Sequence, residues 1–292
     1  MPRWTADDIG PLDGRTVLVT GATSGLGRAG AEILVAKGAR VLGTGRDPSR
    51  VPAGVEPVRL DLADLESVRT AAAEVRERTG DRLDVLMNNA GVMGIPAEYT
   101  VDGFERQIAT NHLGHAALTW LLMPALRNGP ASRVVVVSSI AHRGGGLDVD
   151  DLHFRRRPYR PAVAYSQSKL ADLLFAAELD RRLRGESTIV VAAHPGMTDT
   201  DLLGVSLRAR GLGWAAGPVN KVVCQRVGIG VLPQLFAAVG PARAGDYVGP
   251  RFEVRGHPAP ARRSAAARDL ALAARLWEVT ASETGITPDP GA

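Results

Sequence analysis

The feature that most constrains the fold of this chain is a glycine-rich segment, Gly21–Arg28 (GATSGLGR), between a strand-like run and a helix-like run. Residues 16–20 (TVLVT) are apolar and β-branched, which predicts a buried parallel strand. Residues 29–37 are helical in character, and residues 39–44 (ARVLGT) form a second apolar run. Glycines at this spacing are a weak signal alone, but within a complete strand–turn–helix–strand unit they predict a dinucleotide-binding crevice.

Each of three glycines in this segment has a physical reason to be there. Gly21 can adopt the positive φ of a tight turn, whereas Gly25 and Gly27 let the backbone approach a pyrophosphate and let the helix pack on the strand. The helix N-terminus then offers unpaired N–H groups to the phosphate.

The end of the second strand is expected to select the cofactor. An acid there would accept the ribose 2′-OH of NAD, but the chain has Gly45 followed by Arg46. A guanidinium is a charged planar fork that suits the 2′-phosphate of NADP. Asp47 argues the other way, although the sequence DPSR resembles a helix cap or turn. We therefore predict NADP(H), with NAD(H) as the less favoured cofactor.

Strand-like and helix-like runs continue to alternate along the chain. Strands are predicted over 58–62, 83–87, 132–139 and 188–193, and helices over 67–78, 104–126, from Tyr165 to 183, and over 262–276. This alternation predicts an α/β fold: a single-domain, Rossmann-like doubly wound parallel sheet over residues 1–292, with helices on both faces. In such a sheet, ligands bind beyond the carboxyl ends of the strands.

Two short patterns in the second half of the chain carry candidate chemistry. Tyr165 and Lys169 are four residues apart, so on a helix they share one face about 6 Å apart along the axis. A nearby ammonium favours the phenolate and would lower the pKa of Tyr165, which gives a proton donor that works near neutral pH. Ser138 and Ser139 end a strand, where a hydroxyl can donate to a carbonyl oxygen. Taken alone, each pattern more often describes an ordinary solvated helix face or a strand-ending turn.

Several motifs, taken in order, resemble the short-chain dehydrogenase/reductase family from about residue 14 to 285. They are TGATSGLG from Thr20, Asp61, NNAG from Asn88, Asn111, Ser139, YSQSK from Tyr165, and Pro195-Gly196. Further details resemble its retinol-dehydrogenase-like branch: NHLGH from Asn111, SSIAH from Ser138, HPG from His194, YVGP from Tyr247, LWEV from Leu276, and 26 positions from Ser139 to Tyr165.

The resemblance implies a role for each catalytic candidate. Tyr165 is the general acid for carbonyl reduction or the base for alcohol oxidation, and Lys169 depresses its pKa and binds the nicotinamide ribose. Ser139 holds the substrate oxygen, and Asn111 holds a water that links Lys169 to solvent. The implied cofactor contacts are Gly21, Thr23, Ser24, Gly25, Leu26, Gly27, Arg46, Asp61, Leu62, Asn88, Ala90, Gly91, Tyr165, Lys169, Pro195, Gly196 and Thr198.

Two loops are expected to surround the substrate, at about 140–164 and 200–227. The second is apolar; Leu202, Leu203 and Trp214, together with Ser139, are the predicted substrate contacts, which favours a lipophilic or polycyclic carbonyl compound. The first contains a basic run over 154–160 (FRRRPYR) that either contacts an acidic group or is simply solvated.

Composition argues against several other classes of protein. The net charge of +4 is only mildly basic and only 4% of residues are aromatic, so we expect no nucleic-acid partner. One cysteine, Cys224, excludes an intramolecular disulfide and fits a reducing cytoplasm, and the histidine spacings do not indicate a metal site. The N-terminus does not resemble a signal peptide and there is no apolar run of 18 residues, so we expect a cytoplasmic protein with no membrane span.

Together these observations predict an NADP(H)-dependent oxidoreductase, a ketoreductase acting on a small-molecule carbonyl or alcohol. Two alternatives stay open: a non-catalytic dinucleotide-binding sensor or scaffold, and an NAD-dependent alcohol or retinol-type dehydrogenase. The family resemblance also makes a homodimer or homotetramer possible, through the helices that contain Asn111 and Tyr165.

Overall fold

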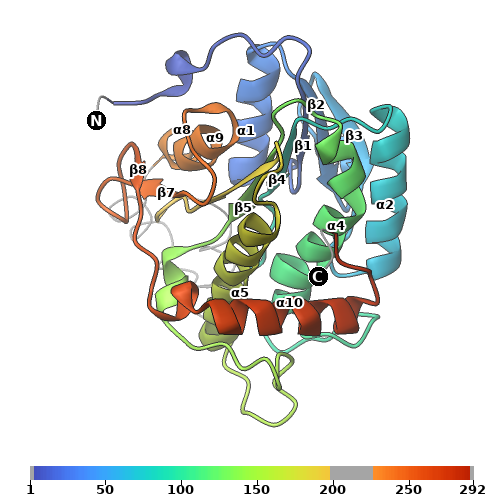
Figure 1. Ribbon diagram of the computed structural model, residues 1–292, viewed down its shortest axis with the longest axis vertical. Coiled ribbons are helices and arrows are strands. Elements are labelled where there is room, and N and C mark those ends of the chain that lie inside the picture. The colour runs from blue at the N-terminus through green and yellow to red at the C-terminus, as the bar shows by residue number, and fades with distance from the viewer. Residues whose placement is uncertain (1–2, 198–225, 290–292) are drawn as a thin grey trace.

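The computed structural model describes residues 3–197 and 226–289. Within these ranges the chain forms an eight-stranded sheet in the order β3-β2-β1-β4-β5-β6-β7-β8 (Figure 1). All neighbouring pairs are parallel except β7 and β8, which are antiparallel. The strands are β1 (Thr16–Val19), β2 (Arg40–Gly45), β3 (Val55–Arg59), β4 (Val85–Asn88), β5 (Arg133–Val137), β6 (Ile189–Ala193), β7 (Tyr247–Pro250) and β8 (Pro258–Pro260).

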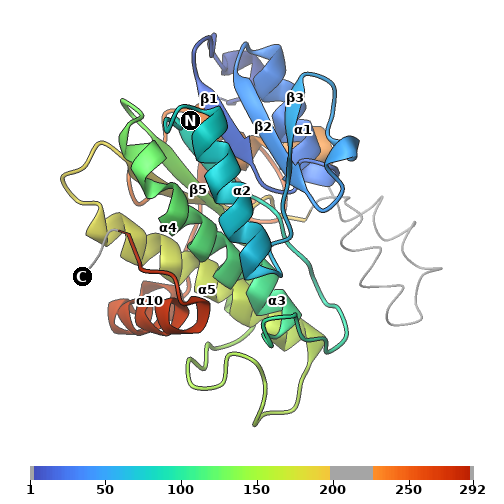
Figure 2. The same ribbon diagram turned by 90° about the vertical axis from the view of Figure 1, so that its right-hand side faces the viewer.

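Helices cover both faces of the sheet. The longer ones are α1 (Gly25–Ala36), α2 (Leu65–Arg78), α4 (Gly114–Arg127), α5 (Pro161–Arg182), α9 (Leu232–Val239) and α10 (Leu270–Thr284), with short turns at α3 (Arg106–Ile108) and α8 (Val227–Gly230). Figure 2 looks onto the layer formed by α2, α4 and α5, with α10 packed outside α5. Helices α1 and α9 pack on the opposite face. The predicted doubly wound α/β fold is confirmed.

The strands are apolar on both sides because both sides are buried. Leu18 packs with residues of α2 and α4, whereas its neighbours Val17 and Val19 pack with residues of α1 and α9. In β5, Val134 and Val135 divide between the two cores in the same way. Successive side chains of one strand therefore contribute to two separate cores, which explains the continuous valine runs in the sequence.

Two predicted elements lie elsewhere in the chain. The third strand is at Val55–Arg59, not 58–62, and residues 60–62 instead form the turn that leads to α2. Pro57 is tolerated there because β3 is at the edge of the sheet, where a missing N–H removes few ladder bonds. The terminal helix is Leu270–Thr284, not 262–276. Its ends are set by Asp269, whose side chain accepts from the Leu272 N–H, and by Gly285 in the left-handed region.

The long helix predicted over 104–126 is interrupted near its start. Residues Ala109–Leu113 form a π-helical turn between α3 and α4. Such turns widen the helix by one residue and often occur at functional sites. Asn111 lies in the middle of this turn.

Candidate active site

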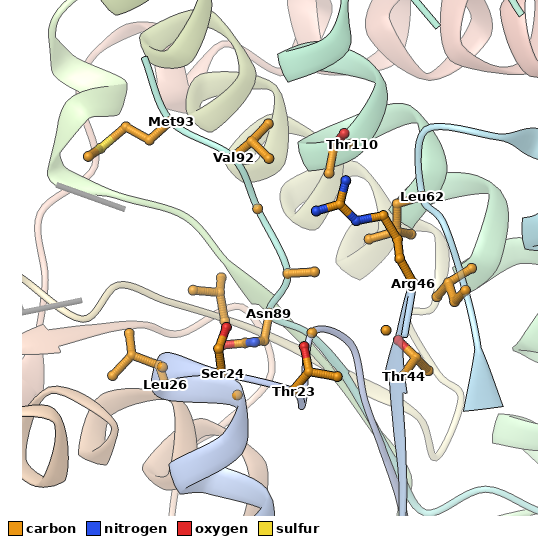
Figure 3. A pocket seen from close by; sticks show the side chains of 18 of the residues that line it. Thr23, Ser24, Leu26, Thr44, Arg46, Leu62, Asn89, Val92, Met93 and Thr110 are labelled. Atoms are coloured by element: carbon orange, nitrogen blue, oxygen red, sulfur yellow. The ribbon is translucent and has the colours of Figure 1, made fainter. Parts of the chain in front are cut away.

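A pocket of about 590 Å³ opens at the carboxyl ends of the parallel strands (Figure 3). It is lined by Gly21, Thr23, Ser24, Gly25, Leu26, Gly27, Thr44, Gly45, Arg46, Leu60, Asp61, Leu62, Asn89, Ala90, Gly91, Val92, Met93, Ile95, Glu98, Arg106, Thr110, Val137, Ser138, Tyr165, Lys169 and Pro195. The glycine-rich turn and the Tyr165–Lys169 pair, which are far apart in sequence, therefore share one cavity, as the sequence predicted.

The glycine-rich turn forms a wall made of backbone. Gly21 and Gly25 have φ angles of 71° and 53°, which side chains rarely tolerate. A Cβ on Gly27 would lie 2.3 Å from the Gly21 carbonyl oxygen, so this position has no room for a side chain. Helix α1 begins at Gly25, and in the described residues its N-cap Ser24 makes no side-chain capping bond. The first-turn N–H groups can therefore serve an anion, so the cradle fits a dinucleotide pyrophosphate.

The end of β2 places a cation, and no free acid, at the pocket. The Asp47 carboxylate caps the next turn, because its Oδ1 accepts from the Ser49 N–H at 3.2 Å and the Ser49 hydroxyl at 2.6 Å. A Cβ on Gly45 would lie 2.5 Å from Thr23 Cγ2, so a side chain at that position would require the Thr23 methyl group to move. Arg46 is exposed, and in Figure 3 its side chain extends from the end of β2 toward Thr110.

The loop after β4 contributes Asn89 rather than Asn88. Asn88 is buried, lies outside the pocket lining, and donates from Nδ2 to Thr119 Oγ1 at 2.8 Å. Asn89 lines the pocket and donates to the Thr20 carbonyl oxygen at 2.7 Å. The two neighbours face opposite ways because side chains alternate along a strand and its extension. Ala90 and Gly91 line the pocket as predicted, and so do Asp61 and Leu62.

Asn111 joins the pocket loop to helix α5 from just outside the pocket lining. Its side chain exchanges bonds with both backbone groups of Val92, at 2.8 and 2.9 Å, and donates to Ser168 Oγ at 2.8 Å. The Asn111 carbonyl oxygen lies 2.9 Å from Nδ1 of His115, whose Nε2 lies 2.9 Å from Thr20 Oγ1. The π-helical turn is thus tied to β1 as well as to α5.

The histidines of this region are packing residues, as the sequence indicated. Burial lowers the pKa of both His112 and His115 to about 3, with a smaller contribution from the positive charge of Lys169. His112 Nε2 lies 2.8 Å from Thr280 Oγ1 on α10. Both rings are therefore neutral at physiological pH. Among residues 3–197 and 226–289, no group of three or more His, Cys, Asp or Glu could hold a metal ion.

The two serines after β5 have different environments. Ser138 lines the pocket, but its hydroxyl donates to the Lys169 carbonyl oxygen at 2.7 Å. Ser139 is half-buried beside the pocket and accepts at Oγ from the Ala141 N–H at 3.1 Å. Its own hydroxyl proton can therefore be donated to a substrate oxygen. His142 Nδ1, 2.7 Å from the Ser139 carbonyl oxygen, fixes the turn behind it.

Tyr165 and Lys169 lie on α5, which begins at Pro161, so Tyr165 is one turn inside the helix rather than at its first residue. Both line the pocket. Lys169 is buried, and its Nζ donates to the Val137 carbonyl oxygen at 2.9 Å and to Asp172 Oδ2 at 2.8 Å. Burial opposes the ammonium, but the charges of Asp172 and Tyr165 raise the pKa of Lys169 above its ordinary value. Lys169 is therefore a cation at neutral pH.

Comparison with known proteins agrees with this geometry. A sequence model of short chain dehydrogenases matches residues 15–210. The chain belongs to the short-chain dehydrogenase/reductase family. Retinol dehydrogenase 13 of Homo sapiens is 38% identical over 290 residues, covering 94% of this chain and 86% of the relative. Polyprenol dehydrogenase of Mus musculus is 41% identical over 290 residues, covering 91% and 83%. The family member described here thus belongs to the retinol-dehydrogenase-like branch.

Solved structures support the same assignment. An uncharacterized protein from Mycobacterium paratuberculosis has a TM-score of 0.82 and 42% identity, over 97% of this chain and 98% of its own. The 3-alpha-hydroxysteroid dehydrogenase of Pseudomonas sp. B-0831, complexed with NADH, has a TM-score of 0.66 and 26% identity, over 80% and 94%. This short-chain dehydrogenase/reductase is therefore an oxidoreductase that uses a nicotinamide dinucleotide, and the glycine cradle fits that cofactor.

The remaining predicted site residues of this oxidoreductase fall into two groups. Pro195 lines the pocket, while Gly196 follows it with φ of 71° and no space for a Cβ beside the Val254 carbonyl oxygen. Thr198, Leu202, Leu203 and Trp214, with nearly all of the predicted loop over 200–227, lie outside the described residues.

The basic run over 154–160 is engaged within its own loop. The backbone N–H groups of Arg155, Arg156 and Arg157 all donate to the Asp151 carboxylate, and Arg157 Nε lies 3.1 Å from Asp151 Oδ2. Bonds to Asp151 therefore hold this loop together, which favours a role of the basic run within the loop over contact with an acidic ligand.

Sequence reasoning missed Val92, Met93 and Ile95, which line the pocket beyond the NNAG motif. Asp172 was also missed. Its signal was available, because an acid three residues after Lys169 on an apolar helix face would need a charged partner.

Proposed function

We propose that this short-chain dehydrogenase/reductase is an NADP(H)-dependent ketoreductase that transfers hydride between the nicotinamide and the carbonyl or alcohol carbon of a lipophilic substrate. The observation that carries the proposal is that Tyr165 and Lys169 line the same cavity as the glycine cradle. The bound cofactor supplies the hydride for reduction and accepts it in oxidation.

The protein's own residues would manage the proton and the substrate oxygen. Tyr165 donates its hydroxyl proton to the carbonyl oxygen as the carbonyl carbon becomes an alcohol, and Ser139 holds that oxygen by a hydrogen bond. The Lys169 ammonium stabilises the phenolate that remains. Asn111 supports the water that returns a proton, since its side chain fixes the loop at Val92 against α5.

The preference for NADP(H) is supported by the end of β2. Arg46 provides a cation at the pocket, Gly45 carries no acid beside it, and the Asp47 carboxylate is used as a cap. A bidentate guanidinium–phosphate contact is stronger and more specific than a contact with a neutral hydroxyl. In cells NADPH usually favours reduction, which is why we propose the ketoreductase direction.

The proposed substrate class is supported by the pocket lining and by the relatives. Leu26, Val92 and Met93 lie on the side of the pocket away from Arg46 (Figure 3). The relatives are named for retinol and polyprenol, which are lipophilic alcohols. Those names also favour a second candidate function, oxidation of a retinol-type alcohol. A non-catalytic sensor is the weakest alternative, because Asn111, Ser139, Tyr165 and Lys169 are all present.

We also propose a cytoplasmic location, from the single cysteine, and a homodimer or homotetramer, from the family. In the part of the chain that the structure describes, no helix is long and apolar enough to span a bilayer. Cell fractionation and light scattering on the purified protein test these two proposals.

The decisive experiment is a titration of the purified protein with NADPH and with NADH, followed by turnover assays. The substrate panel pairs lipophilic ketones and aldehydes with short-chain analogues that carry the same carbonyl group. We expect tighter binding of NADPH and a kcat/KM that rises with the apolar size of the substrate. Equal binding of the two cofactors would remove the assigned role of Arg46, and tight binding without turnover on any compound would favour the sensor.

A further inference from the structure

We infer that Asp172 is a positioning residue of this site: it fixes the Lys169 ammonium, offsets part of the charge that Tyr165 experiences, and so keeps Tyr165 in its proton-donating form to higher pH. This inference rests on the proposed function, because it assigns Asp172 a part in the proton transfer of Tyr165. Asp172 also extends to higher pH the range in which Tyr165 is protonated, the form that carbonyl reduction requires.

The geometry places Asp172 directly behind the catalytic pair. Asp172 follows Lys169 by one helical turn on α5, and their side chains meet at 2.8 Å. Residue exposure is only 5% for Lys169 and 3% for Asp172, so water screens this contact little. The other acceptor of the Lys169 ammonium is the neutral Val137 carbonyl. Asp172 thus supplies the negative charge that accompanies this buried cation in the described structure.

The groups that face this pair from other elements do not replace that charge. His112 on the π-helical turn and His115 on α4 both interact with Lys169, but burial lowers the pKa of each to about 3. Both are neutral in the working range of pH. On α5 itself, Tyr165 is the remaining titratable group that interacts with Lys169. The local charge is therefore set by Tyr165, Lys169 and Asp172 together.

Electrostatics gives the sign of the effect of Asp172 on the ionisation of Tyr165. An anion beside Lys169 makes the electrostatic potential at Tyr165 less positive and disfavours the phenolate. Replacing Asp172 by the isosteric, neutral Asn removes an anion that opposes the phenolate, so while Lys169 remains an ammonium the ionisation of Tyr165 moves to lower pH.

The protonation of Asp172 itself makes this effect depend on pH. Burial raises its pKa to about 6, against the opposing effect of Lys169. Above that pH the carboxylate is charged, and below it the group takes up a proton and the cluster becomes electrostatically like the Asn variant. The electrostatic effect of Asp172 on Tyr165 should therefore be complete above pH 7 and absent below about pH 5, where the carboxyl group is protonated.

The test measures Tyr165 directly and needs no substrate. Tyrosinate absorbance is recorded against pH for each protein and for the same protein carrying Tyr165→Phe, and the difference isolates Tyr165. Burial raises the pKa of Tyr159 and of Tyr247, so those two residues ionise at higher pH. The matched control is Asp180→Asn, a half-buried acid on the same helix away from the pocket.

We expect the Tyr165 midpoint to fall by about one pH unit in Asp172→Asn, a tenfold change in phenolate fraction, and to stay unchanged in the control. A midpoint that is unchanged or higher in Asp172→Asn overturns the inference. If Asp172→Asn does not fold, Asp172→Ser removes the charge with a smaller polar side chain, and the same shift is expected.

A pH profile of turnover separates this inference from the proposed function. In Asp172→Asn, the decline of ketone reduction at high pH should begin about one unit lower than in wild type. Wild-type protein that turns over no substrate defeats the proposed function, while the absorbance titration still decides the role of Asp172. Normal wild-type turnover with an unshifted Tyr165 midpoint defeats the inference alone.

Discussion

The two halves of the active-site pocket present different groups to a ligand: one presents mainly backbone and the other mainly side chains. The half formed by Gly21–Arg28 is a backbone surface, where glycines keep the space free of side chains and a helix N-terminus offers its N–H groups. The half formed by β5 and α5 is a side-chain surface: Ser138, Tyr165 and Lys169 line it, and Lys169 is held by a bond from its Nζ to the Val137 carbonyl oxygen. This difference predicts that cofactor binding and catalysis can be impaired separately. Adding an atom to the backbone half should weaken cofactor binding, whereas removing a side-chain group from the other half should lower turnover.

The largest expected effect is on the side-chain half. Tyr165→Phe removes the proton donor and should lower kcat/KM by about 10³-fold, while the Kd for NADPH changes by less than about twofold. Steady-state kinetics and fluorescence titration of the cofactor measure the two quantities. Tyr99→Phe, an exposed tyrosine in the same chain, is the control. Unchanged turnover in Tyr165→Phe would show that another group supplies the proton.

A smaller effect is expected from adding one methyl group to the backbone half. Gly27→Ala brings a Cβ within 2.3 Å of the Gly21 carbonyl oxygen, so the turn must shift. We expect the Kd for NADPH to rise by about a hundredfold, equivalent to about 2.7 kcal/mol, because the phosphate cradle is displaced. Gly10→Ala, where a Cβ meets no atom within 4 Å, should bind normally. Equal binding by both variants would mean that the cradle does not contact the cofactor.

The third prediction concerns selectivity within the backbone half. Arg46→Ala should weaken NADPH binding by about ten- to a hundredfold and leave NADH binding unchanged, since only NADPH carries the 2′-phosphate. Isothermal titration with both cofactors gives the ratio. Arg50→Ala, a neighbouring exposed arginine outside the pocket lining, should alter neither affinity. An equal loss of affinity for both cofactors would mean that Arg46 contacts a part of the dinucleotide that NADPH and NADH share.

The smallest expected effect is at the junction of the two halves. Thr20 Oγ1 accepts from the N–H groups of Asn89 and Ala90, and it also lies beside His115 Nε2. Thr20→Val keeps the shape but removes these bonds, and should lower the free energy of unfolding by about 1–3 kcal/mol. Chemical denaturation measures this loss, with Thr16→Val at the start of the same strand as control. Loss of cofactor affinity without loss of stability would instead make Thr20 part of the binding half.

How far the sequence predicted the site depends on what each feature requires. The glycine turn and the Tyr165–Lys169 pair were predictable because each is fixed by local geometry, a positive φ or a helical repeat. The choice between Asn88 and Asn89 was not, because the face reverses with each residue and the end of β4 cannot be located to one position from sequence. The π-helical turn at Asn111 leaves no compositional signal, since it depends on contacts of Asn111 with Val92, Ser168 and His115.

In the fold, too, the elements fixed by local sequence were predictable and those that depend on tertiary contacts were not. Strands buried on both faces were predicted nearly to the residue, whereas β3, β7 and β8 were shifted or missed. All three contain proline, which opposes strand propensity, and they form because neighbouring strands provide partners. Both ends of α10 were misplaced: the prediction over 262–276 began before the Asp269 cap and ended short of Gly285, the two residues that bound the helix.

The prolines at the two ends of the sheet have a consequence for how copies of this protein meet. Pro57 lies on edge strand β3, and Pro258 and Pro260 lie on edge strand β8. Each lacks the N–H that an added strand would need, so neither border is a good template for sheet extension or fibrous aggregation. Within the described residues, the two borders of this valine-rich sheet are thereby poorly suited to recruit a further strand.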